Sequence, residues 1–201
     1  MIVKICGLTN REDALAAAEA GATALGFNFF AGSPRYVRPE AAARIIEELP
    51  PSVWTVGVWV NEDPEQILAL SVSHGIQVAQ LHGDEGPDSV PSGIRVWKAV
   101  RMGAASGKID RESRQVEALV LDTAAAGLYG GTGQTFDWSI ARSVPGKVIL
   151  AGGLDASNVR EAIRTAKPWG VDAASRLEIA PGRKDHVKMS EFIKAALEET
   201  E

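Results

Sequence analysis

The chain has 201 residues, 45% of them apolar and 23% charged, a composition typical of a globular protein with one continuous core rather than of a disordered chain. Its 26 acidic residues outnumber its 21 basic ones, for a formal charge of −5, and no basic run is present, so nucleic acid and anionic membrane are poor candidates as partners. The single cysteine, Cys6, excludes an internal disulfide and a multi-cysteine metal site, and the three histidines lack metal-ligand spacing.

Short apolar, β-branched runs recur along the chain, each followed by a more polar segment. Eight such runs in 201 residues correspond to about 25 residues per unit, the spacing of strand-plus-helix repeats. Their interiors are almost entirely apolar, as expected for strands that helices cover on both faces. The predicted strands are residues 2–6, 24–28, 54–60, 78–81, 95–100, 118–122, 148–151 and 170–174.

Helix signals fill the segments between these strands. Thr9-Asn10-Arg11-Glu12 fits a capping box, and Asp63-Pro64 combines an N-cap residue with a first-turn proline. Pro39, Asp155 and Asp185 mark three further helix starts. Residues 82–95 and 137–143 allow only one or two helical turns, because the first segment is rich in glycine and proline and the second is short.

This alternation predicts an α/β protein, a single-domain (β/α)8 TIM barrel over residues 1–201, because closure of eight parallel strands removes both exposed sheet edges. A doubly wound open sheet is the structural alternative if two of the weaker strands are wrong. The sequence has no apolar stretch of about 18 residues and no signal-peptide pattern, so we expect a cytoplasmic protein. We expect a monomer, because no long apolar stripe is left over.

The carboxyl ends of the strands predict where the chemistry lies, because barrel enzymes carry their working groups there. The first strand ends at Cys6 and the sixth at Asp122, which puts a thiol and a carboxyl group on opposite sides of one barrel mouth. A thiolate needs a nearby cation, for which Lys4 and Arg35 are the candidates. Each also has a plainer interpretation: Cys6 as a small buried apolar group, and Asp122 as a cap or ion-pair partner.

Glycine-rich segments in the same region indicate an anion site. Gly152-Gly153 ends the seventh strand ahead of a helix, and the seventh and eighth loops of such barrels commonly bind phosphate. Gly130-Gly131-Thr132-Gly133 lacks the lysine of a nucleotide-binding loop. We interpret it as a lid whose glycines supply hinge freedom.

The other polar residues at the strand ends are more ambiguous. Arg35 could form a bidentate pair with a substrate carboxylate, or be a solvated loop charge. His82 and Asp172 could each orient a neighbouring group, and the fifth strand supplies Lys98 and Arg101. The five tryptophans lie in or beside predicted elements, so we assign them to the core and to packing between helices and barrel.

Taken together and in order, these motifs resemble the N-(5′-phosphoribosyl)anthranilate isomerase family over essentially the whole chain. The opening Lys-Ile-Cys-Gly combined with the late Gly-Gly-Thr-Gly segment is far more specific than any one motif. The matching segments are Lys4-Ile5-Cys6-Gly7-Leu8-Thr9, Ser33-Pro34-Arg35-Tyr36-Val37, Gln80-Leu81-His82-Gly83, Leu121-Asp122-Thr123, Gly130-Gly131-Thr132-Gly133 with Phe136-Asp137-Trp138, Ala151-Gly152-Gly153-Leu154 with Asn158-Val159, Val171-Asp172, and Pro181-Gly182-Arg183-Lys184-Asp185.

The resemblance implies an Amadori rearrangement in tryptophan biosynthesis that converts a small phosphosugar, an aldose amine, into a ketose amine without metal or organic cofactor. The family's general base falls on Cys6, acting on C2 of the ribose unit. Its general acid falls on Asp122, acting on the furanose ring oxygen. Arg35 matches the arginine that holds the anthranilate carboxylate, and His82 and Asp172 match positions that line the substrate.

The phosphate site implied by the resemblance contains one departure from the family pattern. It falls on Gly152, Gly153, Ser175 and Arg176, and the family commonly has Ser-Ser-Gly-Val-Glu where this chain has Ala174-Ser175-Arg176-Leu177-Glu178. If Arg176 keeps the backbone shape, its guanidinium could strengthen the hold on phosphate. If the position requires a positive φ, the change costs stability or alters the loop.

Two other functions fit parts of the pattern. An isomerase of histidine synthesis acts on a related phosphoribosyl aminoaldose by the same chemistry, but usually with two aspartates, and Cys6 argues against it. A non-catalytic sugar-phosphate binding protein on a decayed barrel is disfavoured because both candidate acid–base groups are present. Measuring turnover of both substrates side by side distinguishes the two isomerases. Tight binding of a sugar phosphate without turnover would indicate the binding protein.

Overall fold

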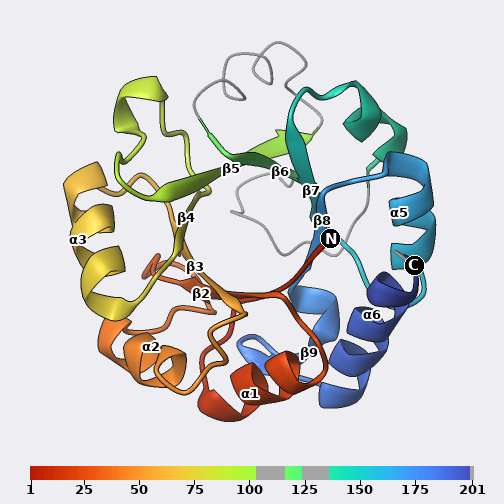
Figure 1. Ribbon diagram of the computed structural model, residues 1–201, viewed down its shortest axis with the longest axis horizontal. Coiled ribbons are helices and arrows are strands. Elements are labelled where there is room, and N and C mark those ends of the chain that lie inside the picture. Colours follow the sequence, from red (N-terminus) through yellow and green to blue (C-terminus); the bar gives the residue numbers. More distant parts are fainter. Residues whose placement is uncertain (103–115, 124–135, 200–201) are drawn as a thin grey trace.

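Eight parallel strands form a closed barrel in the computed structural model, which describes residues 1–102, 116–123 and 136–199 (Figure 1). The strands follow chain order around the ring, and β1 pairs with both β2 and β8. The prediction of a closed barrel is therefore confirmed, and the open sheet is wrong. The strands are β1 (Ile2–Cys6), β2 (Ala24–Asn28), β3 (Trp54–Trp59), β4 (Val78–Leu81), β5 (Arg95–Met102), β6 (Ala118–Thr123), β7 (Lys147–Leu150) and β8 (Gly170–Ala173).

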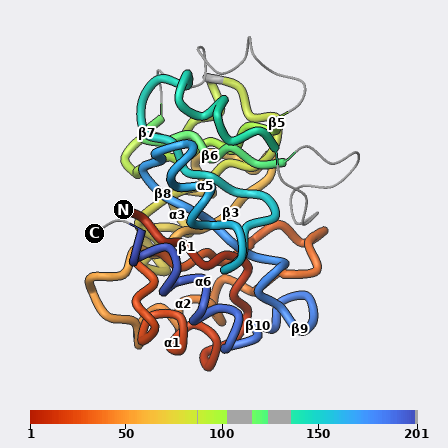
Figure 2. The backbone as a smooth tube through the Cα atoms, turned by 90° about the vertical axis from the view of Figure 1, so that its right-hand side faces the viewer, coloured from red at the N-terminus to blue at the C-terminus, as the bar shows by residue number. Residues whose placement is uncertain are grey.

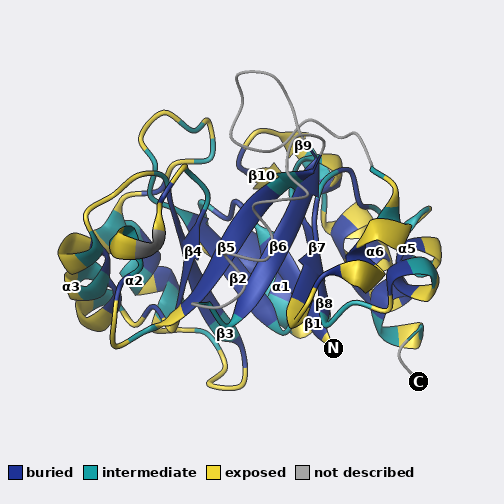
Figure 3. Ribbon diagram, turned by 90° about the horizontal axis from the view of Figure 1, so that it is seen from above, coloured by how far each residue is buried: buried dark blue, intermediate teal, exposed yellow. Residues whose placement is uncertain are grey.

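Helices surround this ring (Figure 1), and their outer sides are exposed while the strands are buried (Figure 3). The two segments expected to hold little helix contain 3-10 turns, η1 and η2. A hairpin of two short strands follows β8 and lies beside α1 and α6 (Figure 2). These elements are α1 (Arg11–Glu19), α2 (Pro39–Ile46), α3 (Pro64–His74), η1 (Pro87–Ser89), η2 (Trp138–Ser143), α5 (Val159–Ala166), η3 (Ser175–Leu177), β9 (Glu178–Ala180), β10 (Arg183–Lys184) and α6 (His186–Glu198).

Two predicted helix starts are wrong by one to three residues. Asn10, not Thr9, caps α1: its side chain accepts a hydrogen bond of 2.9 Å from the N–H of Asp13, while Thr9 donates to the carbonyl of Gly182. Asn158, not Asp155, precedes α5. Asp155 instead accepts from the N–H of Ser157 in the loop before the helix, at 2.9 Å.

The side chains inside the barrel change from apolar to polar along each strand. Successive residues of a strand face opposite sides, so β6 turns Ala118, Val120 and Asp122 inward and Leu119 and Leu121 outward. On β1 the inward series is Ile2, Lys4 and Cys6, and on β4 it is Val78 and Gln80, continued by His82. Polar inward positions therefore coincide with the end of the barrel where the strands finish, which we call the carboxyl mouth.

The opposite end of the barrel is closed by three indole rings, the tryptophan cluster of Trp54, Trp97 and Trp169. Their ring centroids lie 5.8 to 6.2 Å apart. Arg95 lies over the ring of Trp54, with 4.9 Å between Cζ and the centroid, and the Lys147 ammonium lies 4.4 Å from the centroid of Trp169. The tryptophans do contribute to the core, as expected, but these three pack with the residues inside the barrel.

The outward faces of the strands bury the helices' apolar stripes in two clusters, a large one and a smaller one that includes Ile67 of α3. In the large cluster, Val3, Ile5 and Leu25 are fully buried together with Phe192 and Ile193 of α6. Burial of each such side chain stabilises the fold by about 1.5–3 kcal/mol, so the helices hold the ring rigid around its mouth. Within the described residues, no helix has the length and apolar character needed to cross a membrane.

Candidate active site

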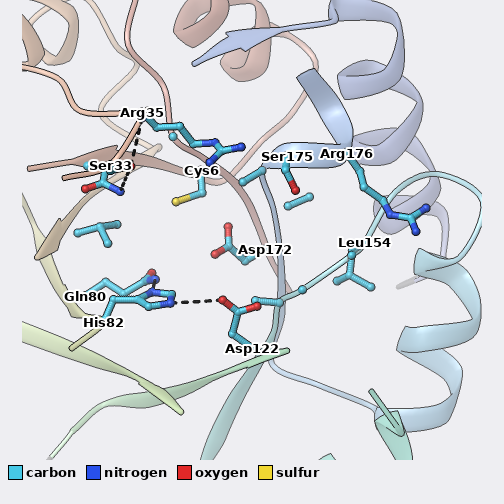
Figure 4. A pocket seen from close by; sticks show the side chains of 18 of the residues that line it. Cys6, Ser33, Arg35, Gln80, His82, Asp122, Leu154, Asp172, Ser175 and Arg176 are labelled. Atoms are coloured by element: carbon cyan, nitrogen blue, oxygen red, sulfur yellow. Dashed lines mark hydrogen bonds and ion pairs between the residues drawn. The ribbon is translucent and has the colours of Figure 1, made fainter. Parts of the chain in front are cut away.

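A pocket opens at the carboxyl mouth and receives side chains from most of the strands and from the loops that follow them (Figure 4). The strand ends contribute Cys6, Asn28, Gln80, Asp122 and Asp172. The loops contribute backbone and side chains from residues 151–154 and 174–176, together with Arg35 and His82. All nine site residues predicted from the sequence line this one pocket: Cys6, Arg35, His82, Asp122, Gly152, Gly153, Asp172, Ser175 and Arg176.

Cys6 lies beside a buried ion pair. Lys4, two residues earlier on β1, is fully buried and its Nζ lies 2.8 Å from Oδ2 of Asp172 on β8. A Cβ built on Gly26 of the adjacent strand would lie 2.8 Å from the Cys6 sulfur and 3.1 Å from the Lys4 Nζ, so both atoms flank that bare glycine. Of the two cations considered for the thiol, Lys4 therefore accompanies it within the barrel.

Burial and charge act in opposite directions on these three groups. Burial raises the pKa of the Cys6 thiol, and the positive charge of Lys4 offsets only part of that rise. Burial also raises the pKa of Asp172, against the opposing effect of Lys4. Burial alone would lower the pKa of Lys4, but the facing Asp172 carboxylate raises it above its ordinary value. Lys4 is therefore held as an ammonium.

Asp122 faces His82 across the pocket. Its Oδ2 lies 3.3 Å from Nε2 of His82, a separation suited to an ion pair when the imidazole is protonated, although the two are not aligned as a hydrogen bond (Figure 4). Its Oδ1 accepts from the N–H of Thr123 at 2.8 Å. The other ring nitrogen of His82 lies 3.4 Å from the side-chain amide of Gln80. These contacts fix the Asp122 carboxyl group with Oδ2 toward the pocket.

Gly152 is a glycine because nothing larger fits beside Asp122. Its φ is +80°, and an added Cβ would lie 2.1 Å from Oγ1 of Thr123 and 2.8 Å from Oδ1 of Asp122. Gly153, with a φ of +64°, follows it, and the Asn158 side chain donates to its carbonyl at 2.8 Å. The pair thus turns the chain sharply away from β7 and exposes backbone at the mouth.

Arg35 is already held by a carboxylate of the protein. Its Nε and Nη2 donate to the two oxygens of Glu178 on β9, at 2.9 and 2.8 Å. Glu178 also accepts from the fully buried Lys184 at 2.9 Å. Although burial alone would raise the pKa of Glu178, its hydrogen bonds and the two cations lower it. Two cations thus share one carboxylate, and this cluster carries a surplus positive charge.

Sequence reasoning missed the contribution of Glu178 and Lys184. They lie in the β9–β10 hairpin around Pro181-Gly182, a turn visible in the sequence, but the pairing of Glu178 with Arg35 joins residues 143 positions apart. Lys98, by contrast, does not line the pocket. It forms a buried ion pair of 2.9 Å with Glu85 and donates to the carbonyl of Gly83, supporting the loop that follows His82.

The departure at Arg176 is accommodated without strain. Arg176 lies in η3, and it is not among the described residues with a positive φ, so the alternative that required one is wrong. Its guanidinium reaches across to Asp155, with 2.7 Å between Nη1 and Oδ2. The loops that follow β7 and β8 are therefore joined at the rim of the pocket by an exposed ion pair.

Within the described residues there is no group of three or more histidine, cysteine, aspartate or glutamate side chains suited to hold a metal ion. The predicted lid, Gly130-Gly131-Thr132-Gly133, lies outside the described residues. The site thus combines a thiol, a carboxyl group facing it across one pocket, a cluster with surplus positive charge, and a glycine turn next to η3.

Comparison with known proteins decides the family. Residues 3–195 match the family of N-(5′-phosphoribosyl)anthranilate (PRA) isomerase. The chain belongs to this family. A relative of that name from Solibacter usitatus is 50% identical, over 98% of this chain and 97% of its own. A crystal structure of phosphoribosyl anthranilate isomerase from Thermotoga maritima superimposes with a TM-score of 0.89 at 43% identity, over 98% of this chain and all of that one.

A further solved member of the family is a complex with reduced 1-(o-carboxyphenylamino)-1-deoxyribulose 5-phosphate, at a TM-score of 0.86 and 41% identity, over 98% of this chain and all of that one. The protein is accordingly an isomerase, a PRA isomerase of tryptophan biosynthesis on the TIM barrel fold. The family expected from the motifs is confirmed.

Proposed function

We propose that the protein converts N-(5′-phosphoribosyl)anthranilate into 1-(2-carboxyphenylamino)-1-deoxyribulose 5-phosphate by an Amadori rearrangement, with Cys6 as general base and Asp122 as general acid. The observation that carries this proposal is that a thiol from β1 and a carboxyl group from β6 line one pocket at the carboxyl mouth. Membership of the family and the ligand of the solved relative support the choice of substrate.

The first step opens the sugar ring. The Asp122 carboxylic acid donates its proton to the furanose ring oxygen, the bond from that oxygen to C1 breaks, and the nitrogen lone pair forms a C1=N iminium. Oδ2 of Asp122 is suited to this step because Oδ1 is held by the N–H of Thr123 and Oδ2 faces the pocket. A general acid of this kind contributes about 10²–10⁴ in rate.

The second step moves the double bond. The Cys6 thiolate takes the proton from C2, the electron pair of that C–H bond forms C1=C2, and the C=N pair returns to nitrogen. The resulting enolamine then tautomerises to the ketose amine: C1 gains a proton and the C2 hydroxyl loses one. Atoms and electrons balance within the substrate, so we propose that no metal or organic cofactor takes part.

The remaining residues are proposed to bind the substrate. The surplus positive charge at Arg35, Lys184 and Glu178 suits the anthranilate carboxylate. Because Glu178 occupies Nε and Nη2 of Arg35, we propose that Nη1 makes the contact, rather than the bidentate fork expected from the sequence. Oδ1 of Asp172 is buried without a hydrogen-bond partner among the described residues, so it is suited to accept from a ribose hydroxyl, and His82 lines the same wall.

The phosphate is proposed to bind at the rim between the loops after β7 and β8. Gly152 and Gly153 turn the backbone there, and Ser175 lines the same part of the pocket. Arg176 supplies a guanidinium at the same rim.

We further propose that the chain acts as a monomer, because exposed large apolar side chains such as Val72, Ile179 and Val187 lie on different elements. Elution from a size-exclusion column at twice the monomer mass would overturn this proposal.

The test of the mechanism uses Cys6→Ala and Asp122→Ala, with turnover followed by the loss of anthranilate-ribosyl fluorescence. Each variant is expected to lose about 10²–10⁴ in kcat while its circular dichroism stays that of the parent. Val72→Ala, at a position 77% exposed on α3, is the matched control and should retain full turnover. Unchanged turnover in both site variants would remove the mechanism.

A further inference from the structure

We infer that Lys4 is the positioning residue that sets the protonation state of Cys6, and that Asp172 opposes it by competing for the same ammonium. This inference deepens the proposed function, on which it rests for the role of Cys6. The geometry that points to it is a buried cation that is paired with the Asp172 carboxylate and shares with the Cys6 thiol the space beside Gly26 at the inner wall of the barrel; Figure 4 shows Cys6 and Asp172 in the pocket above it.

The strand places Lys4 and Cys6 on the same side. They are two residues apart on β1, so both face inward. Gly26 on the neighbouring strand leaves the space into which both side chains extend, because a Cβ there would be 2.8 Å from the sulfur and 3.1 Å from the ammonium nitrogen. The side chain of Lys4 has no exposed surface, so water cannot screen its charge from the sulfur.

Asp172 is the competitor. Its Oδ2 holds the Lys4 ammonium at 2.8 Å, while its Oδ1 has no hydrogen-bond partner among the described residues. A carboxylate this close neutralises much of the positive field at the sulfur and adds a negative one of its own. Lys4 and Asp172 therefore act on the thiol in opposite directions.

The other charges near the sulfur are less suited to this role. Lys184 on β10 contributes positive charge, but it is paired with Glu178, as is Arg35 from the loop after β2. Asp122 of β6 and His82 after β4 act on the Asp172 carboxyl group from the far wall. Lys4 is the cation nearest to Cys6 along its own strand, and Asp172, its carboxylate partner among the described residues, can be changed to asparagine with almost no change of shape.

The experiment measures Cys6 directly, without substrate. Because Cys6 is the only cysteine of the chain, the rate of alkylation by iodoacetamide and the thiolate absorbance near 240 nm both report this one group. The variants are Lys4→Met, which keeps length and removes charge, and Asp172→Asn, which keeps shape and removes the competitor. Lys184→Met removes the buried ammonium of the Arg35–Glu178 cluster and is the matched control.

Lys4→Met is expected to slow alkylation at neutral pH by at least about tenfold, because losing a close opposite charge lowers the thiolate fraction. Asp172→Asn is expected to speed it, because the Cys6 thiolate also raises the pKa of Lys4 and can hold the ammonium once the competing carboxylate is gone. Lys184→Met is expected to change it less than Lys4→Met does. The acid limb of the kcat/KM profile should move the same way as the alkylation profile for each variant.

Opposite shifts from Lys4→Met and Asp172→Asn support the inference, since a merely structural disturbance would not change sign. Equal rates, shifts in one direction, or an equal effect of Lys184→Met would overturn it. If Lys4→Met fails to fold, Asp172→Asn decides alone: faster alkylation supports the inference, and unchanged or slower alkylation overturns it. If the variants change the alkylation of Cys6 as expected but Cys6→Ala retains turnover, the proposed function fails. The inference that Lys4 sets the protonation state of Cys6 then still holds.

Discussion

At its amino end the barrel interior holds three tryptophan rings, whereas toward the carboxyl mouth it holds a thiol, two carboxyl groups and a buried ammonium. The rings of the tryptophan cluster contact one another and are covered by Arg95 and Lys147. At the mouth, Oδ1 of Asp172, Oε1 of Gln80 and Nε2 of His82 are buried without hydrogen-bond partners in the described part of the chain.

This difference separates stability from chemistry along a few residues of each strand. Close-packed apolar groups gain free energy by leaving water, while buried polar atoms without partners cost it. The barrel therefore concentrates its stabilising contacts at one end and tolerates unpaired atoms at the other, where a substrate can supply the missing partners. Substitutions at the two ends should accordingly have separable effects on unfolding and on turnover.

The largest expected effect on stability comes from Trp97→Ala at the amino end. Trp97 is fully buried and contacts both other rings of the tryptophan cluster, so its loss should lower the free energy of unfolding by about 3–5 kcal/mol. Urea denaturation measures this loss, and kcat of the remaining folded protein should stay within about twofold of the parent. A folded variant with strongly reduced kcat would contradict the separation of the two ends.

Gly152→Ala, at the carboxyl mouth, should instead lower turnover more than stability. A methyl group there would meet Thr123 and the Asp122 carboxyl group, and displacing a reacting group by about 1 Å can cost on the order of 10² in kcat/KM. Gly146→Ala is the matched control, because its φ of +85° carries the same backbone strain, while no atom of the described part of the chain lies within 4 Å of the added Cβ. If both variants lose turnover equally, backbone strain rather than the clash is responsible.

Arg35→Lys should raise KM by roughly tenfold with little change in kcat, because lysine cannot form the two-point pair with Glu178 that orients the guanidinium. Steady-state kinetics separate the two constants. Arg11→Lys removes a comparable two-point pair with Glu48 on the surface and should leave both constants unchanged. A fall in kcat alone for Arg35→Lys would assign Arg35 to the chemical step instead.

The smallest effect is expected for Arg176→Gly, which restores the residue common in the family. The pair with Asp155 is exposed, with 42% of the Arg176 side chain accessible, and such pairs contribute about 0–1 kcal/mol. KM should therefore change by less than about fivefold, as measured at low and at physiological salt. A rise of a hundredfold would make Arg176 the principal phosphate ligand.

The sequence allowed the ring and the mouth to be predicted because both depend on local patterns. Apolar runs located all eight strands, and the strand ends located Cys6 and Asp122. The sequence also indicated Lys4 as a candidate cation for the thiol, and the alternation of faces agrees, since Lys4 is two residues before Cys6 on the same strand. Contacts between distant segments were not predicted. The ion pairs of Arg35 with Glu178 and of Arg176 with Asp155 have no local signature in the sequence.

Helix starts were misassigned for a related reason. Asp155 and Thr9 are good capping residues by type, yet each is used elsewhere. Asp155 binds Ser157 and Arg176, and Thr9 binds the carbonyl of Gly182 from the β9–β10 hairpin. Residue type limits which groups can cap a helix, but tertiary partners decide which one does.

The seam between β1 and β8 joins the first and last strands of the ring, and the pair of Lys4 and Asp172 lies across it, 168 positions apart in the chain. In a partly synthesised or partly refolded chain, Cys6 and Lys4 are present without the Asp172 carboxylate beside them until β8 pairs with β1. Recovery of the native thiol reactivity during refolding therefore reports the pairing of β1 with β8, and a polypeptide cut between those strands would regain it only when its two parts reassemble.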